Sequence, residues 1–520
     1  MEIAGNKPSS RIENTSRNIV SGAINKCVSI LLTFINRTVL LQLLGAELTG
    51  LSDLFADILQ VLNLAELGLH TAIVYSLYDP VAKQDKKAIC EKLSILRSVY
   101  HIVGLLVFGL GIAIMPFLPR MIKSGYPGEI SLQGLFALFL FDSGISYYLF
   151  AYKETLLIAD QRQDIATNIR TAIVILKNVL QLAILIFTRS FYAYAAVSIA
   201  ATVTINILIN RKVSKHYPYL KSFKEKVKIP SEMRTQISGL LISRISDTCR
   251  KSFDGMIISM TLGLVATAIY GNYNNVQFAL YGIMLAVCNA MSASIGNSIA
   301  LRGEKENYEN LLDFSMIFSW ILGWSAITMA CLYQPFMFLW VGKSMMLPIF
   351  DMLLFVLYFY VINMNDIRNQ YITGTGIWWR LKTSYIVEAV SNLGLNIILG
   401  KMLGIKGVIL ASIITIILFN YLQRNHVLFK TYFKNESIGV FYRQQCAYFA
   451  IACSALALTY YLCIRISPNY SIMSIAVRFF ICLIIPNAIF LLAYKMCSRW
   501  SSAVLFIKRV AAKQLGSSAI

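Results

Sequence analysis

Charged residues are scarce in this sequence. Asp, Glu, Lys and Arg make up 14% of its 520 residues, whereas a soluble domain typically carries about 25%. Hydrophobic residues reach 57%, and the mean hydropathy is +0.62. This composition excludes an ordinary soluble protein, and we expect a chain that crosses a membrane repeatedly.

Residues and segments that commonly carry chemistry are missing as well. The four histidines are never paired at the spacing of a metal site, and the sequence contains no GxSxG, HExxH or Walker A motif. The longest hydrophilic stretch, about 211–236, is too short to fold around a core of its own. We therefore do not expect an enzyme, and any activity must use the membrane helices.

Paired cysteines and a cleavable leader are two further absences. The ten cysteines form no CxxC pair, and most lie within apolar runs. We interpret them as small buried apolar residues rather than as a disulfide framework or a metal site, and we expect no cofactor. The polar start "MEIAGNKPSSRIENTSRN" leads into an apolar run without a small-residue cleavage site, so no signal peptide is expected.

Apolar runs of membrane-spanning length recur from end to end. A bilayer core of about 30 Å needs about 20 helical residues. The segments near residues 63 and 249 are polar, so twelve or thirteen spans are the alternative counts. The sequence predicts an all-α polytopic membrane protein with about fourteen transmembrane helices, centred near residues 30, 63, 106, 143, 177, 200, 249, 283, 325, 359, 391, 416, 455 and 483.

Basic residues lie mainly on one side of the expected membrane. With fourteen spans, the two termini and every second loop share a side, and most of the 47 Lys and Arg residues fall there, above all in Arg211–Arg234. By the positive-inside rule both termini are cytoplasmic. This placement explains the net charge of +21 without nucleic acid. A nucleic-acid site would be expected to combine a basic patch with aromatic side chains. Contact with anionic membrane lipids is expected instead.

The same basic segment divides the chain. We expect an N-terminal lobe of six spans at 1–210, a basic cytoplasmic linker at 211–235, a second six-span lobe at 236–428, and a trailing helix pair with a basic tail at 429–520. The two lobes begin alike, with "QLLGAELTGLSDLFAD" in the first and "TLGLVATAIYGNYNNV" in the second. Because six is even, both lobes start in the cytoplasm. Transporters built from such repeats bind substrate between the halves, so we expect a central cavity.

The segment "ISRISDTCRKSFDGMIIS", residues 242–259, carries five charges within an apolar region. Charges at the centre of a span cost roughly 2.5–3.5 kcal/mol each, about 12–18 kcal/mol in all. Neighbouring apolar residues return only about 3–6 kcal/mol, so this helix should not face lipid. At 100° per residue the charges share one stripe of about 120°, formed by Arg244, Asp247, Arg250, Lys251 and Asp254.

Polar stripes recur in other spans, chiefly at the start of each lobe. They have two interpretations: polar contacts that hold helices together, or the lining of a pathway. For the set as a whole we favour a pathway, with Arg250 and Asp57 as structural or interfacial residues. A basic stripe suits phosphate or carboxylate, and amides and hydroxyls suit sugars. The candidate cavity residues are Lys26, Arg37, Glu66, Arg244, Asp247, Lys251, Asp254, Glu388 and Asn392.

Four stretches, in order along nearly the whole chain, carry a family resemblance. The sequence resembles the polysaccharide-exporter (Wzx-type) flippases of the multidrug/oligosaccharidyl-lipid/polysaccharide (MOP) superfamily. The stretches are "LLGAELTGLSDLFADILQVLNLAELGLHTAIVYSLYDPVAKQD" (43–85), "SFDGMIISMTLGLVATAIYGNYNNV" with "SASIGNSIA" (252–276 and 292–300), "FMFLWVG" (336–342) and "YIVEAVSNLGLNIILGKMLGIKGVILASI" (385–413).

The resemblance implies a transporter of the bacterial inner membrane. Its two lobes would rock between inward- and outward-open states and flip undecaprenyl-diphosphate-linked oligosaccharide for assembly of O-antigen, capsule or exopolysaccharide. Polysaccharide polymerase machinery would be a partner, and a proton or sodium gradient would supply the coupling ion, with no residue assigned to it. Gly255 departs from the family, which often has Asn there. Carried over by position, the acidic motif residues are Glu66, Asp254 and Glu388, and the cationic lumen fits Lys26, Arg37, Arg244 and Lys251.

Three alternatives remain open. A multidrug or cation antiporter of the same superfamily would be expected to have an acidic, aromatic cavity. The basic stripes argue against this alternative. A lipid II flippase differs from the favoured interpretation only in its substrate. A membrane glycosyltransferase or polymerase belongs to another class, and a polymerase would be expected to carry a large external loop, whereas the longest external loop expected here is 119–130.

Overall fold

The structure is a computed structural model, and nearly all of the residues that it describes are helical. No strand occurs among the described residues, so the predicted all-α class is confirmed. Within that part of the chain, eleven helices are long and apolar enough to cross a membrane, or twelve if a bent pair counts as one span. The described residues are 11–63, 74, 76–123, 125–126, 128, 130–222, 231–497, 499–502 and 504.

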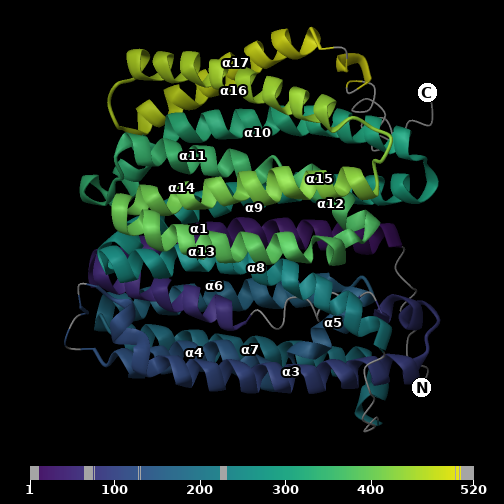
Figure 1. The fold of residues 1–520 in the computed structure, drawn as a ribbon. Helices are drawn as coiled ribbons and strands as arrows, with labels where there is room; N and C mark the ends of the chain where they lie inside the picture. The colour runs from purple at the N-terminus through teal and green to yellow at the C-terminus, as the bar shows by residue number, and fades with distance from the viewer. Residues whose placement is uncertain are drawn as a thin grey trace. The chain divides into compact units, whose positions relative to one another are not determined.

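The first compact unit spans Met1–Ala268. In it α1 packs on α6 and α8, α6 packs on α7, and α4 packs on both α3 and α7 (Figure 1). Large buried side chains such as Phe55, Tyr100 and Phe136 form its core. Its helices are α1 (Arg11–Leu62), α3 (Lys86–Ile114), η1 (Met115–Met121), α4 (Leu132–Tyr148), η2 (Ala151–Lys153), α5 (Glu154–Ala159), α6 (Gln163–Thr188), α7 (Phe191–His216), η3 (Pro218–Ser222) and α8 (Ser231–Leu262).

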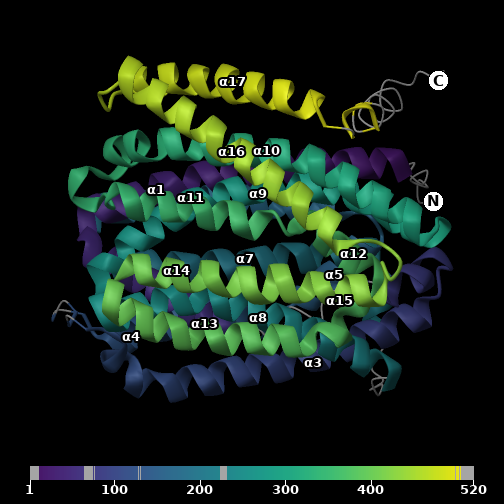
Figure 2. The same cartoon turned by 45° about the horizontal axis from the view of Figure 1, so that its top comes forward.

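The second unit spans Ile269–Ile520 and contains most of α9 (Leu264–Leu301), which begins in the first unit. Here α13 pairs with α14, while α10, α16 and α17 pack on one another (Figure 2). A π-helical stretch, η6, joins α14 to α15. The helices are α10 (Glu304–Val341), η4 (Lys343–Met345), α11 (Ile349–Asn363), α12 (Asp366–Thr375), η5 (Ile377–Leu381), α13 (Lys382–Leu403), α14 (Ile405–Thr415), η6 (Ile416–Gln423), α15 (Arg424–Thr431), α16 (Ile438–Ile466) and α17 (Ile472–Lys495).

Two of the fourteen expected spans differ from the apolar helices of the structure. The first expected span continues into the second within the single 52-residue element α1, where Gly45 breaks the helix with φ 85° and ψ 175°. The second span extends into residues 64–73, which lie outside the described residues. The span near residue 249 is α8, and it is not among the helices apolar enough to cross a membrane. These are the two polar segments that made twelve or thirteen spans the alternative counts.

Contacts place the boundary between the units after Ala268, so α8 groups with the helices that precede it. A lobe boundary at 211–235 rests on the sequence pattern and stays a prediction.

Backbone turns reveal a repeat that the two opening motifs only suggest. Gly45 and Gly263, in the similar "LLG" and "TLG" stretches, both adopt the left-handed φ that favours glycine. Further left-handed residues recur at nearly the same separation, as expected if the two halves of the chain follow one helical plan. Such pairs in the described residues are Gly45 and Gly263, 218 positions apart, Gly125 and Gly342, 217 apart, and Gln161 with Gly376 and Arg189 with Gly404, each 215 apart.

Candidate functional site

Arg37 and Asp53 lie on the two segments of α1, on either side of Gly45. The Arg37 guanidinium donates from Nη1 to Oδ1 and from Nη2 to Oδ2 of Asp53, each at 2.7 Å. Nη2 also donates to the backbone oxygen of Ala268 at 3.2 Å. Paired, charge-assisted hydrogen bonds of this kind are strong and directional. The predicted cavity residue Arg37 therefore joins the two segments of α1 to each other and to the start of α9.

Three carboxylates gather where α1 meets α8. Asp57 lies close enough to Asp53 and Asp254 for their negative charges to interact. Asp254, a predicted cavity residue, is buried with 1% of its surface exposed. A Cβ at the neighbouring Gly255 would overlap the carboxylate of Asp57. The departure from the family pattern at Gly255 thus has a packing reason, because only glycine lets α8 approach this carboxylate.

Amide side chains on another face of α1 bind α6. Asn25 Nδ2 donates to Thr171 Oγ1 at 2.7 Å. Asn36 Nδ2 donates to the Asn178 side-chain oxygen and, at 3.3 Å, to Gln181 Oε1. The helix-packing interpretation therefore holds for these amides. Lys26, a predicted cavity residue beside Asn25, is exposed.

Four of the predicted cavity residues have no described side chain, and the cavity role of all nine stays a prediction. Glu66 lies outside the described residues. Arg244, Asp247 and Lys251 belong to the backbone of α8, but their side chains lie outside the described part of the structure. The charged stripe of this helix consequently rests on its sequence pattern.

In the second unit, Glu388 forms a buried ion pair that joins α13 to α15. Arg424 Nη2 donates to Glu388 Oε2, and both side chains are almost wholly inaccessible to solvent. The Arg424 guanidinium also lies over the ring of Tyr385, 3.9 Å from its centroid. Breaking such a pair by removing one partner is costly because it leaves an uncompensated buried charge. In this conformation Glu388 is an internal residue of the second unit.

Arg368 on α12 brings a second buried cation to the same region. Its Nη1 donates to the Asn420 backbone oxygen at 3.0 Å, and its Nη2 donates to Asn420 Oδ1 at 2.6 Å and to Asn365 Oδ1 at 2.8 Å. Its charge interacts with those of Arg424 and Glu388. Arg368 therefore joins α12 to η6 beside the ion pair of Glu388 and Arg424.

Sequence reasoning missed Arg368 and Arg424. The available signal was a single basic residue near the end of each apolar segment, "NDIRNQY" and "YLQRNH". Basic residues at such places are expected to flank a span at the cytoplasmic surface. For this reason the sequence did not predict that these two arginines are buried.

Asn392 continues the polar face of α13 toward α14. Its Nδ2 donates to Ser412 Oγ at 3.0 Å and to Thr415 Oγ1 at 3.3 Å. Asn396 Nδ2 in turn donates to Asn392 Oδ1 at 3.2 Å. The i, i+4, i+8 spacing predicted one shared face for Glu388, Asn392 and Asn396, and all three are fully buried. The structure therefore brings together the predicted residues of α13, with hydroxyl partners that the sequence did not identify.

No family model matches the sequence, and no curated protein matches it. Solved structures do match. The lipid II flippase MurJ in an inward closed conformation matches 92% of this chain and 99% of its own, with a TM-score of 0.70 and 14% identity. An inward-facing multidrug resistance MATE family transporter of the MOP superfamily matches 79% of this chain and 99% of its own, with a TM-score of 0.58 and 15% identity.

The chain has the fold of the MOP superfamily transporters. A MOP superfamily transporter from Pyrococcus furiosus, described as having a binding pocket of reverse polarity that suggests a different function, shares it as well. That match covers 81% of this chain and 96% of the other, with a TM-score of 0.54 and 13% identity. This fold is the one expected from the sequence motifs. At identities this low the matches show the fold alone, and neither the superfamily nor the polysaccharide-exporter type.

Proposed function

We propose that this chain is a flippase that carries undecaprenyl-diphosphate-linked oligosaccharide across the bacterial cytoplasmic membrane by alternating access. The observation that supports this most is the MOP fold, shared over 92% of the chain with a flippase of another lipid. The oligosaccharide substrate is favoured by the four sequence stretches that resemble polysaccharide exporters. The product would enter O-antigen, capsule or exopolysaccharide assembly through polymerase machinery.

The charges of the chain suit such a substrate. A diphosphate requires cations, and guanidinium groups bind phosphate through paired hydrogen bonds. Exposed Lys26 on α1 and the basic stripe predicted for α8 supply cations, while amides and hydroxyls can bind sugar hydroxyls. We further propose that both termini lie in the cytoplasm and that a proton or sodium gradient drives the cycle.

Lipid II is the second candidate substrate. The match to a lipid II flippase at a TM-score of 0.70 favours it directly. The antiporter alternative is supported by MATE structures of the same fold, but the basic stripes oppose a cationic drug as substrate. Transport of a lipid-linked precursor therefore remains the stronger proposal. An experiment must decide between lipid-linked oligosaccharide and lipid II.

The deciding experiment uses a strain of the source bacterium that lacks this chain. Membrane lipids are extracted, lipid-linked oligosaccharide and lipid II are quantified, and surface polysaccharide is stained. Accumulation of the oligosaccharide intermediate with loss of surface glycan would support the proposal. Accumulation of lipid II with cell lysis would support the second candidate. Unchanged levels of both, with raised sensitivity to cationic drugs, would overturn the flippase proposal in favour of drug export.

A further inference from the structure

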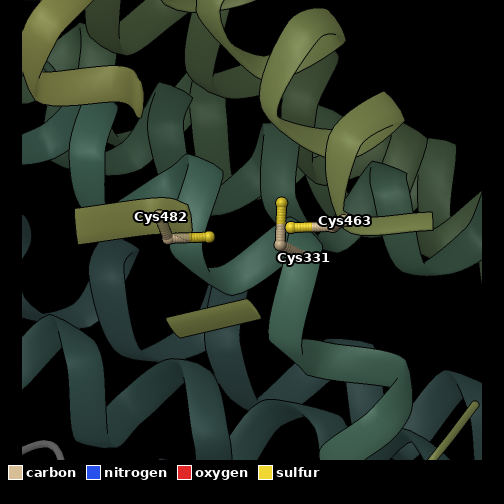
Figure 3. A group of neighbouring side chains, drawn as sticks. All are labelled: Cys331, Cys463 and Cys482. Carbon is tan, nitrogen blue, oxygen red and sulfur yellow. The ribbon is translucent and has the colours of Figure 1, made fainter. Parts of the chain in front are cut away.

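Three cysteines from distant parts of the sequence meet inside the second unit. Cys331 lies on α10, Cys463 on α16 and Cys482 on α17, three helices that pack on one another. All three are fully buried, and their Sγ atoms lie within 4.8 Å of one another. Figure 3 shows the side chains of Cys463 and Cys482 directed toward each other, with the Cys331 side chain beside that of Cys463. None of them belongs to the candidate transport residues, so the cluster calls for its own explanation.

The spacing of the sulfurs suits a single metal ion. Metal–thiolate bonds of about 2.3 Å in a trigonal centre place the sulfurs about 4 Å apart, within the spread seen here. Soft thiolate ligands select Cu(I) or zinc over hard cations such as magnesium. Zinc structural sites are almost always completed by a fourth ligand. Within the described part of the chain the group holds these three sulfurs and no fourth His, Cys, Asp or Glu ligand, so it fits a three-coordinate Cu(I) ion better than zinc.

A buried cation next to the cluster offsets part of the charge of such a centre. Arg478 Nη1 donates to the backbone oxygen of Cys331 at 3.1 Å. Its Nε and Nη2 donate to the backbone oxygen of Ser467 at 3.1 and 2.7 Å. Arg478 is buried, with 4% of its surface exposed. A Cu(I) ion bound by three thiolates carries two negative charges, which are costly in a helix bundle unless they are paired. Arg478 offsets one of them from a fixed position.

We propose that Cys331, Cys463 and Cys482 bind one Cu(I) ion. As each metal–sulfur bond forms, the thiol loses its proton to solvent and the copper stays monovalent, so no oxidant or reductant is required. The bound ion joins α10, α16 and α17 at one point. The sequence-based interpretation of these cysteines as apolar packing residues explains why they are buried. It does not explain why their three Sγ atoms lie together.

The first test measures copper retention by the purified full-length protein in detergent. Cu(I) is supplied without oxygen as its bicinchoninate complex, which competes for the metal. The wild type is expected to retain one copper per chain, and the triple variant Cys331→Ser, Cys463→Ser, Cys482→Ser is expected to lose that equivalent. The matched controls are Cys288→Ser, buried on α9, and Cys27→Ser, exposed on α1. Equal retention by wild type and triple variant, or none by wild type, overturns the proposal.

A second measurement uses only the wild type, so it does not depend on whether the triple variant folds. X-ray absorption at the copper edge reports the ligand atoms and their number. Three sulfur ligands are expected. A shell of nitrogen or oxygen atoms, or of fewer sulfurs, would show adventitious binding elsewhere and overturn the proposal. Displacement of the copper by equimolar zinc would overturn the assignment to a monovalent ion.

Discussion

Gly255 decides how closely α8 can approach α1. A methyl group there would overlap the Asp57 carboxylate, and overpacked contacts cost about 1–3 kcal/mol. We expect Gly255→Ala to lower the melting temperature of the detergent-solubilised protein. Asp57→Ala in the same background removes the obstructing group and should restore part of the loss. Gly22→Ala is the control, because nothing lies within 4 Å of that position on α1. A melting temperature of Gly255→Ala equal to that of the wild type would contradict this packing.

The ion pair between Glu388 and Arg424 gives a second prediction at this scale. Glu388→Gln leaves the Arg424 charge buried without its partner. Removing one partner of a buried ion pair lowers the free energy of unfolding by about 3–5 kcal/mol. We therefore expect little monodisperse protein by size-exclusion chromatography. The double variant Glu388→Gln, Arg424→Met removes both charges and should regain a folded protein.

Transport by the double variant separates packing from substrate binding. If Glu388 serves only the second unit's packing, the double variant transports as the wild type does, measured by the level of lipid-linked intermediate in cells. If Glu388 contacts substrate, the double variant folds but the intermediate accumulates. A stable Glu388→Gln single variant would show that the buried pair contributes little.

At the scale of helices and turns, Gly45 connects two segments of α1 through a left-handed backbone conformation. Gly45 has φ 85° and ψ 175°, a region occupied almost only by glycine, where a side chain costs on the order of 1–3 kcal/mol. Gly45→Ala should therefore lower the melting temperature, whereas Gly22→Ala on the same helix should not. Arg189 occupies the left-handed helical region, with φ 51° and ψ 21°, whereas Gly404 shares its positive φ but has ψ −144°. We expect Arg189→Gly to leave the melting temperature unchanged or to raise it, because glycine adopts a positive φ without a side-chain clash. A drop as large as that of Gly45→Ala would contradict this cost at Arg189.

Hydropathy predicted most of the helices because a backbone in lipid must satisfy its own hydrogen bonds. The spans expected near residues 106, 177, 325 and 455 correspond to α3, α6, α10 and α16. Hydropathy does not predict the π-helical η6 or the 49° bend between α4 and the helix that follows it. Both depend on packing against other helices rather than on the apolarity of the segment itself.

The candidate site was predictable only where spacing along one helix carried the information. The face shared by Glu388 and Asn392 follows from their i, i+4 separation on α13. Their partners Arg424 and Ser412 come from other helices, and no local pattern connects them. The meeting of Arg37 with Asp53 was likewise hidden, because it depends on the turn at Gly45.

For the molecule as a whole, the proposed function makes the charged stripe of α8 the place to test transport. We expect Lys251→Glu or Arg244→Glu to raise the lipid-linked intermediate to the level of the deletion strain while the protein stays in the membrane. The control is Arg302→Glu, at an exposed surface pair with Glu306 of the kind that contributes about 0–1 kcal/mol. Normal transport by both α8 variants would show that the cationic-cavity interpretation of this helix is wrong.

The buried charges of the second unit also constrain how the chain enters the membrane during synthesis. Arg368, Glu388 and Arg424 lie on three successive membrane segments, and each charge released alone into lipid costs about 2.5–3.5 kcal/mol. Glu388 reaches its partner only after 36 further residues have been made. Pairing with Arg424 removes this cost, so we expect the segments that contain α13 and α15 to enter the bilayer together rather than one at a time.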